Sequence, residues 1–242
     1  MSLTDSYFVI MDNDGDSYTY YKQTNNNNNH NNGNGESGNG GGTNTSSTGK
    51  QNGHQWVDLG LSVKWATMNI GASSPEDYGN YYAWGETTTK STYDWLTYKW
   101  CNGSYYTLTK YCTTSKWGTV DNKTTLDLKD DAAHANWGGT WRMPTVDEIK
   151  ELKEKCNWEW TTQSGVNGQK VTGPNGNSIF LPAAGIRWDD RLNRAGYGGD
   201  YWSSSFCPGG DTYAYELGFN SDGTYWDDYY RSYGQSVRAV CP

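Results

Sequence analysis

The chain has 242 residues, a formal net charge of −8 at pH 7 and a sequence pI of about 4.8. It contains no basic run and no apolar run of about 18 residues, which argues against nucleic-acid binding and against direct insertion into a membrane. Aromatic residues make up 15% of the chain, with 13 Trp and 20 Tyr against 4 Phe, so we expect a core built largely from hydrogen-bonded rings.

Two short runs near the N-terminus predict a hairpin. Residues 7–10 and 18–21 have strand composition, and residues 12–16 between them form a turn. The alternating Asp and Asn of that turn also suggest a calcium loop. However, Ser17 and Gln23 stand where such a loop needs a Gly and a bidentate Glu, so we expect a turn without calcium.

Composition then divides the chain into three parts. Residues 1–23 are a hairpin or the remnant of another domain. Residues 24–53 are mostly Asn, Gly, Ser and Thr, which bury too little apolar area to offset chain entropy, so they predict a flexible linker. Residues 54–242 read as one domain.

Within that domain, residues 56–59 and 63–66 predict strands. A Ser-Pro pair at Ser74 predicts the start of a helix. The sequence Thr-Val-Asp-Glu at residues 145–148 is a capping box and predicts a second helix. Residues 178–182 predict a further strand, and short strands and long loops follow. Two early helices before many short strands indicate an α+β domain.

The last third of the chain alternates two kinds of sequence. Blocks at residues 201–205, 215–219 and 236–240 predict strands, whereas the runs between them hold Tyr, Trp, Asp and Gly with almost no aliphatic residues. Large rigid rings beside adaptable polar groups are typical of a paratope, so these runs predict a ligand-binding surface. Ordinary polar loops of a tyrosine-rich protein are the alternative. The candidate site residues are Trp188, Asp189, Asp190, Phe206, Asp211, Tyr225, Trp226, Asp227, Asp228, Tyr229, Tyr230 and Tyr233.

Six blocks of the domain resemble one known family. They are WVDLGLSVKWA, YYAWGE, WRMPT, LPAAG, YWSSS and SVR, at residues 56–66, 81–86, 141–145, 181–185, 201–205 and 236–238. In this order, over about residues 54–241, they resemble the Fibrobacter succinogenes major paralogous domain. The resemblance implies a C-type lectin-like domain, of the variant found in formylglycine-generating enzymes. It also implies that strands near residues 56–59 and 237–240 lie side by side.

The C-terminal half also resembles the variable proteins of diversity-generating retroelements, which share this fold. In those proteins, mutagenesis at adenines in a C-terminal repeat alters residues that line a ligand-binding face. Residues 206–212 belong throughout to the set that mutated AAY codons reach. Glu216 and Trp226 do not, so they are either scaffold or evidence against diversification. A family member with a fixed surface is the alternative.

The five cysteines say little about disulfides or metal sites. They are Cys101, Cys112, Cys156, Cys207 and Cys241, and their spacing shows no C-x-x-C and no zinc pattern. An odd number leaves at least one thiol free or in an intermolecular bridge. Cys101 and Cys112 are candidates for a disulfide that closes a loop, and unpaired thiols are the alternative.

No catalytic or metal motif accompanies the aromatic runs. The carboxylate triplets of calcium-dependent lectins are absent, so we expect no cofactor, and calcium at the acidic pairs 189–190 or 227–228 is the alternative. The resemblance makes Cys207 and Cys241 the C-terminal candidates for a formylglycine-generating type of oxidase, but nothing in the sequence puts a base beside either. Carboxylates such as Glu86 and Glu216 are available to a glycosidase, as in any acidic protein.

We therefore expect a ligand-binding or adhesion module and not an enzyme. Its expected partner is a protein or glycan on a cell or host surface. A structural stalk or pilus-tip subunit is the alternative. Family members are typically secreted or attached to the surface of gut and rumen bacteria, and Met1-Ser2-Leu3 is typical of an engineered start. We thus expect an extracellular or cell-surface protein whose export signal has been removed.

Overall fold

The computed structural model describes residues 7–11, 17–21, 47–208 and 210–242 and divides the chain into two units, Met1–Asn44 and Thr45–Pro242. The protein mixes helices and strands. Its described strands are mostly antiparallel and lie in small sheets, and its described residues include two α-helices. The predicted mixture of α and β structure is confirmed at this level.

The first unit contains the predicted hairpin. Strand β1 (Tyr7–Met11) pairs with β2 (Ser17–Tyr21) in antiparallel register, with Tyr7 opposite Tyr21. The predicted turn and its alternative as a calcium loop, residues 12–16, lie outside the described residues.

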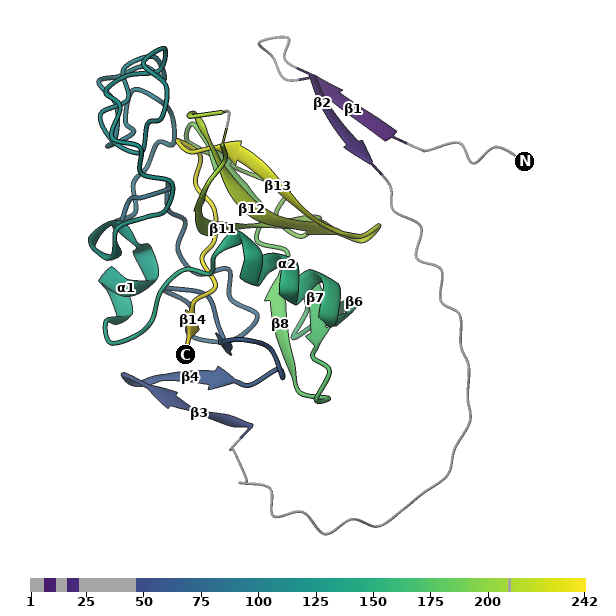
Figure 1. Cartoon of the computed structure of the whole chain (residues 1–242). Coiled ribbons are helices and arrows are strands. Elements are labelled where there is room, and N and C mark those ends of the chain that lie inside the picture. The colour runs from purple at the N-terminus through teal and green to yellow at the C-terminus, as the bar shows by residue number, and fades with distance from the viewer. Residues whose placement is uncertain (1–6, 12–16, 22–46, 209) are drawn as a thin grey trace, which may run out of the picture. The chain divides into compact units, whose positions relative to one another are not determined.

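A four-stranded sheet brings together the two ends of the second unit. It contains β3 (Thr48–Gln51), β4 (His54–Val57), β5 (Lys64–Ala66) and β14 (Val240–Cys241), in the order β14-β5-β4-β3 (Figure 1). The strands expected side by side therefore share this sheet, but β5 lies between β4 and β14.

The linker boundary predicted at residue 53 is too late, because β3 lies inside the predicted linker. Asn52 and Gly53 connect β3 to β4 with φ angles of 45° and 84°. Asn and Gly are the residues that enter this left-handed region at least cost, so the tract that reads as low complexity ends in a specific hairpin turn.

The two helices are α1 (Ala132–Trp137) and α2 (Val146–Lys155). The capping box of α2 is present as predicted. The backbone N–H of Glu148 donates to the Thr145 hydroxyl at 3.2 Å, and the backbone N–H of Thr145 donates to the Glu148 carboxylate at 2.8 Å. These bonds satisfy two N–H groups that a helix start leaves unpaired.

The helix predicted at Ser74 is wrong. The Asp77 carboxylate instead accepts the backbone N–H groups of Ser73 and Ser74, both at 3.1 Å, and closes a turn. The sequence reading also missed α1, whose start is capped by Asp131 through the backbone N–H of His134. A 3-10 turn over Leu128–Asp130 precedes that cap.

The rest of the second unit consists of strands. β6 (Asn157–Gln163), β7 (Val166–Thr172) and β8 (Ser178–Pro182) form a meander, and β9 (Ile186–Trp188) and β10 (Arg191–Asn193) form a hairpin. A third sheet contains β11 (Gly198–Phe206), β12 (Tyr213–Asn220) and β13 (Thr224–Tyr230). The strands predicted at 178–182, 201–205 and 215–219 are confirmed. Of the block at 236–240, only Val240 enters a strand.

The core is aromatic and hydrogen-bonded, as the composition predicts. The buried indole N–H groups of Trp84 and Trp202 donate to backbone carbonyls of Ser203 and Tyr82, both at 2.8 Å. Trp202 and its neighbours form one buried cluster, and a second lies between α2 and the sheet of β11–β13. Hydrogen-bonded indoles of this kind lock chain segments that are far apart in sequence.

Candidate binding surface

The run at residues 224–230 is β13, an ordered strand with its seven residues paired to β12 (Figure 1). It was predicted to be a loop. Because side chains alternate across a strand, its rings and acids are divided between two faces of the sheet. The cross-strand pairs on one face are Tyr225 with Gly218, Asp227 with Glu216, and Tyr229 with Ala214.

Trp226 lies on the other face, against α2. Its ring centre is 4.4 Å from the ammonium nitrogen of Lys150, and Tyr215 meets it edge-on at 5.7 Å. The side chain opposite Trp226 in β12 is Leu217, which belongs to the buried cluster beneath α2. Trp226 is therefore a scaffold contact on that face, although 40% of the residue remains exposed.

Four of the predicted site residues form a continuous set of ring contacts. The ring of Trp188, at the end of β9, lies 6.1 Å from that of Tyr233. The Tyr233 ring lies 5.5 Å from Tyr229 and 5.6 Å from Tyr230 on β13. By strand alternation Tyr229 and Tyr230 belong to opposite faces of β13, and the Tyr233 ring meets both of them, so three segments contribute to this set. All four residues are partly buried.

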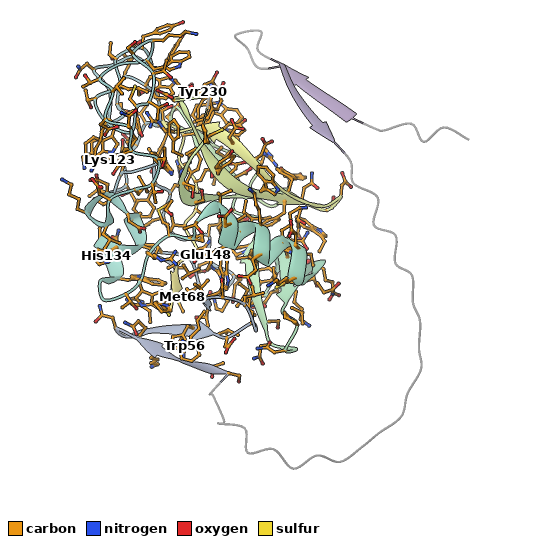
Figure 2. The ribbon with its side chains drawn as sticks, in the orientation of Figure 1. Trp56, Met68, Lys123, His134, Glu148 and Tyr230 are labelled. Atoms are coloured by element: carbon orange, nitrogen blue, oxygen red, sulfur yellow. The ribbon has the colours of Figure 1, made fainter. Side chains whose placement is uncertain are left out.

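Two aromatic residues that the sequence reading missed extend this surface. Tyr213 stacks on Tyr230 with ring centres 4.6 Å apart, and Trp95 meets Tyr230 edge-on at 6.1 Å. Figure 2 shows Tyr230 at the end of the sheet nearest the loops that precede α1. We call the whole set the aromatic band, and its members are Trp95, Trp188, Tyr213, Tyr229, Tyr230 and Tyr233.

The loops beyond Trp95 carry further exposed apolar groups. Leu96 is 80% exposed and Tyr106 is 51% exposed, and Tyr106 stacks on Trp117 at 5.3 Å. The signal for these residues is present in the sequence, because Trp and Tyr are dense between residues 93 and 117.

Phe206 and Asp211 do not belong to the surface. Phe206 ends β11 and is 2% exposed, packed in the core cluster that contains Trp202. Asp211 is fully buried, and its carboxylate accepts the Thr113 hydroxyl and the backbone N–H groups of Thr113 and Thr114, all at 2.7 Å. It fastens a distant loop to the β11–β12 connection, so these two positions are structural.

The acidic pair Asp189 and Asp190 is exposed at the turn of the β9–β10 hairpin. Asp189 adopts a φ of 51°, and its backbone exchanges two hydrogen bonds with Tyr93, at 2.8 and 3.0 Å. Asp190 lies 3.9 Å from Arg191, in a pair that solvent screens. Both carboxylates therefore remain available at the edge of the band.

Asp227 and Glu216 lie in less polar surroundings. Burial and the charge of Asp228 raise the pKa of Asp227 to about 6, although a hydrogen bond from the backbone N–H of Asp228 acts in the opposite direction. Burial, with the nearby charges of Asp200 and Asp227, raises the pKa of Glu216 well above its usual range. Two carboxyl groups on directly opposite positions of adjacent strands therefore resist ionising together.

Asp228, on the opposite face from Asp227, contacts the thiol of Cys207. Burial and the charge of Asp228 raise the pKa of that thiol to about 11, so it stays protonated at neutral pH. A reactive cysteine needs a lowered pKa, so this environment does not favour the oxidase alternative. All five cysteines lie in described residues and are free thiols, including the pair Cys101 and Cys112.

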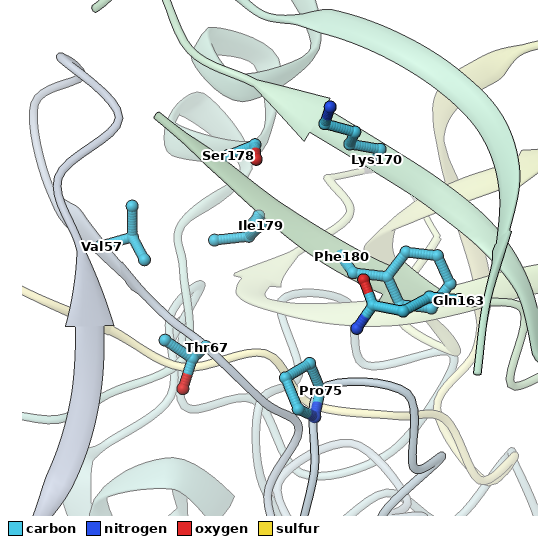
Figure 3. A pocket seen from close by; sticks show the side chains of 8 residues that line it. All are labelled: Val57, Thr67, Pro75, Gln163, Lys170, Ser178, Ile179 and Phe180. Carbon is cyan, nitrogen blue, oxygen red and sulfur yellow. The ribbon is translucent and has the colours of Figure 1, made fainter. Parts of the chain in front are cut away.

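No three His, Cys, Asp or Glu side chains among the described residues are arranged to hold a metal ion. A depression of about 190 Å³ lies on a different part of the domain. Gln163, Lys170, Ile179 and Phe180 are among the side chains that line it (Figure 3). It involves the β6–β8 meander and none of the predicted site residues.

No protein-family model, curated protein or solved structure matches this chain. Among the described residues, no helix has the length and apolar character needed to cross a membrane. The residues of the site therefore carry the functional argument.

Proposed function

We propose that the second unit is a ligand-binding or adhesion module and that the aromatic band is its binding surface. The observation that carries this proposal is the continuous contact from Trp188 through Tyr233 to Tyr230, which joins residues more than 40 positions apart. Tyr and Trp in such clusters provide most of the energy at many protein interfaces. Asp189 and Asp190 at one end add polar groups that orient a ligand.

The finer fold assignment is part of this proposal. A C-type lectin-like domain is supported by the sheet that joins both ends of the unit and by the positions of the family blocks. YWSSS lies in β11 and WRMPT leads directly into α2. Retroelement diversification is also proposed, but for a smaller set of positions. Random replacement of buried Phe206 or Asp211 would disrupt packing, so diversity is tolerable only at surface positions such as Asp189 and Tyr230.

Binding is favoured over catalysis by the setting of the acidic groups. A glycosidase needs two carboxyl groups on either side of a bound sugar. Here Glu216 is 2% exposed and lies beside Asp227 on one face of one sheet, so no sugar ring fits between them. The Cys207 thiol is held protonated, which removes the nucleophile that an oxidase requires.

A structural subunit, whose band packs on a neighbouring subunit, is the second candidate. The partial burial of Tyr225, Tyr229 and Tyr230 favours it, because a free binding site exposes its anchors more fully. The two candidates differ in self-association. Sedimentation of the chain at high concentration separates them, since a subunit that polymerises through the band forms concentration-dependent oligomers.

The experiment that tests binding is a screen of extracellular proteins and glycans with the wild-type chain and a Trp188→Ser variant. A matched control is Tyr197→Ser, because Tyr197 is 81% exposed and lies outside the band. Binding that Trp188→Ser abolishes and Tyr197→Ser retains supports the proposal. Binding that both variants retain places the site elsewhere and refutes it.

A further inference from the structure

A group of polar side chains lies at the side of the aromatic band. Glu216 on β12 faces Asp227 on β13, and Tyr225 and Tyr229 stand two residues to either side of Asp227. Gln235, from the segment after β13, donates its amide N–H to the Glu216 carboxylate. We call these five residues the Asp227 cluster.

Arg194 is the positive side chain nearest the cluster. It pairs with the neighbouring Asp200 at 3.1 Å, and its Nη2 atom donates to the Tyr225 hydroxyl at 3.2 Å. Among the described residues, no Lys, Arg or His lies within ion-pair distance of Glu216 or Asp227. Removing carboxylates from water without a counter-charge is costly, so this arrangement is stable only when protonated or when a cation is supplied.

Buried acceptors in the same place also lack donors. Gln235 is fully buried with its amide directed at Glu216, yet its Oε1 atom has no hydrogen-bond partner in the described part of the chain. Oδ2 of fully buried Asp200 is likewise without one. Buried polar atoms are nearly always paired, so these two acceptors add to the electronegative character of the cluster.

Asp227 is the member that a ligand can reach. Unlike Glu216 beneath it, Asp227 is only partly buried. Its Oδ1 atom accepts the backbone N–H of Asp228 at 2.9 Å, and its Oδ2 atom is left for another donor. The flanking tyrosines stand on the same face of the sheet, each about 7 Å away along the strand.

We propose that the Asp227 cluster binds the guanidinium group of an arginine side chain presented by a protein ligand. This inference rests on the proposed binding function and names the chemistry of its partner. A guanidinium supplies several donors to a carboxylate and also packs against tyrosine rings. The exposed carboxylates of Asp189 and Asp190 and the net charge of −8 complement a basic partner surface. A neutral glycan supplies hydroxyl donors but no charge to balance Glu216 and Asp227.

The test uses the whole chain and three probes, with titration followed by NMR. The probes are N-acetyl-arginine amide, its neutral isostere N-acetyl-citrulline amide, and a neutral oligosaccharide of glucose. We expect saturable binding of the arginine probe, with the citrulline probe at least about tenfold weaker. Equal binding of the arginine and citrulline probes, or saturable binding of the oligosaccharide alone, overturns the proposal.

Two variants locate the binding. Asp227→Asn keeps the shape of the side chain and removes its charge, and it is expected to weaken arginine binding at least about tenfold. Asp222→Asn is the matched control, since Asp222 is an exposed acid at the β12–β13 turn outside both the band and the cluster, and it is expected to change affinity by less than about twofold. Tyr229→Leu, which keeps an apolar side chain without the ring face, gives an independent reading and is expected to weaken binding several-fold.

The outcomes also separate the two proposals. If the screen finds a partner whose binding needs Trp188 but is unchanged by Asp227→Asn, the cluster proposal fails and the binding function stands. If the arginine probe does not bind and no partner depends on Trp188, both fail. An Asp227→Asn protein that melts as the wild type does but binds the arginine probe equally well refutes the cluster directly.

Discussion

The ammonium nitrogen of Lys150 on α2 lies 4.4 Å from the ring centre of Trp226 on the edge strand β13. Trp226 was predicted to be a binding anchor, but its ring makes this contact between helix and strand. Trp226 belongs to the same aromatic run as Tyr225 and Tyr229, yet strand alternation turns it to the opposite face. The contact helps to hold β13 on α2.

Composition alone predicts that Trp226→Ala costs about 2 kcal/mol of binding and little stability. The contact with Lys150 reverses this prediction. We expect Trp226→Ala to lower the free energy of unfolding by about 1–2 kcal/mol and to change ligand affinity less than about twofold. For comparison, Trp202→Ala in the core should cost about 3–5 kcal/mol. Thermal melts and titrations of both variants check this. Loss of binding by Trp226→Ala at an unchanged melting temperature would contradict the face assignment.

The Trp188 ring is expected to be an anchor of the aromatic band. Trp188→Ala should cost about 2 kcal/mol of binding to the partner that the screen identifies, because the ring joins the hairpin to Tyr233 at the surface. Stability should fall by less than about 1 kcal/mol, since the residue is only partly buried. Calorimetric titration measures the first value and chemical denaturation the second. Tyr197→Ala serves as the control and should alter neither.

Asp211 is predicted to be a structural residue. Asp211→Ala removes the acceptor of three part-buried hydrogen bonds from Thr113 and Thr114. We expect a loss of about 2–4 kcal/mol in the free energy of unfolding. Denaturant melts measure the loss, and Asp190→Ala, at an exposed acid, should be nearly neutral. If Asp211→Ala weakened ligand binding without lowering stability, Asp211 would be a binding residue and this prediction would be wrong.

Glu216 should make the folded state less stable as pH rises. Its pKa in the folded protein is raised above the usual 4.5, mainly by burial, so the stabilising contribution is present at low pH and is lost as pH rises through the folded value. Gln at this position stays neutral and keeps the shape. We expect the melting temperature of Glu216→Gln to exceed that of the wild type by an amount that grows from pH 5 to pH 8. A difference that is constant over this range would show that Glu216 does not titrate as proposed.

Binding of the arginine probe should depend on pH through Asp227. Its pKa of about 6 means that the carboxyl group is neutral below and charged above that pH, so affinity should rise between pH 5 and pH 7. The groups that face it or act on it are Glu216, Asp200, Arg194, Tyr225 and Asp228. NMR titrations at several pH values measure the effect. Asp227→Asn should remove most of it, and a wild-type profile without slope would contradict the assignment.

Local chemistry in the sequence determined several elements by itself. The capping box at Thr145 and Glu148 predicts α2 because both hydrogen bonds form within four residues. The strand blocks of β8, β11 and β12 follow from composition, and the N-terminal hairpin follows from a turn between two strand runs. The aromatic surplus predicts a hydrogen-bonded aromatic core. At Ser74, however, the local signal failed, because the Asp77 carboxylate bonds the same N–H groups in a turn.

The membership of the site was decided only by tertiary structure. Asp189 and Asp211 look alike in the sequence, but one is exposed at a turn and the other is buried by a loop 98 residues away. Similarly, the run at 224–230 becomes a strand, whose alternation separates Trp226 from Asp227. Trp95 enters the band through a ring contact with Tyr230, across more than a hundred residues. Composition reports which residue types are present, whereas burial and facing depend on which distant segments pack together. Only the folded chain contains that information.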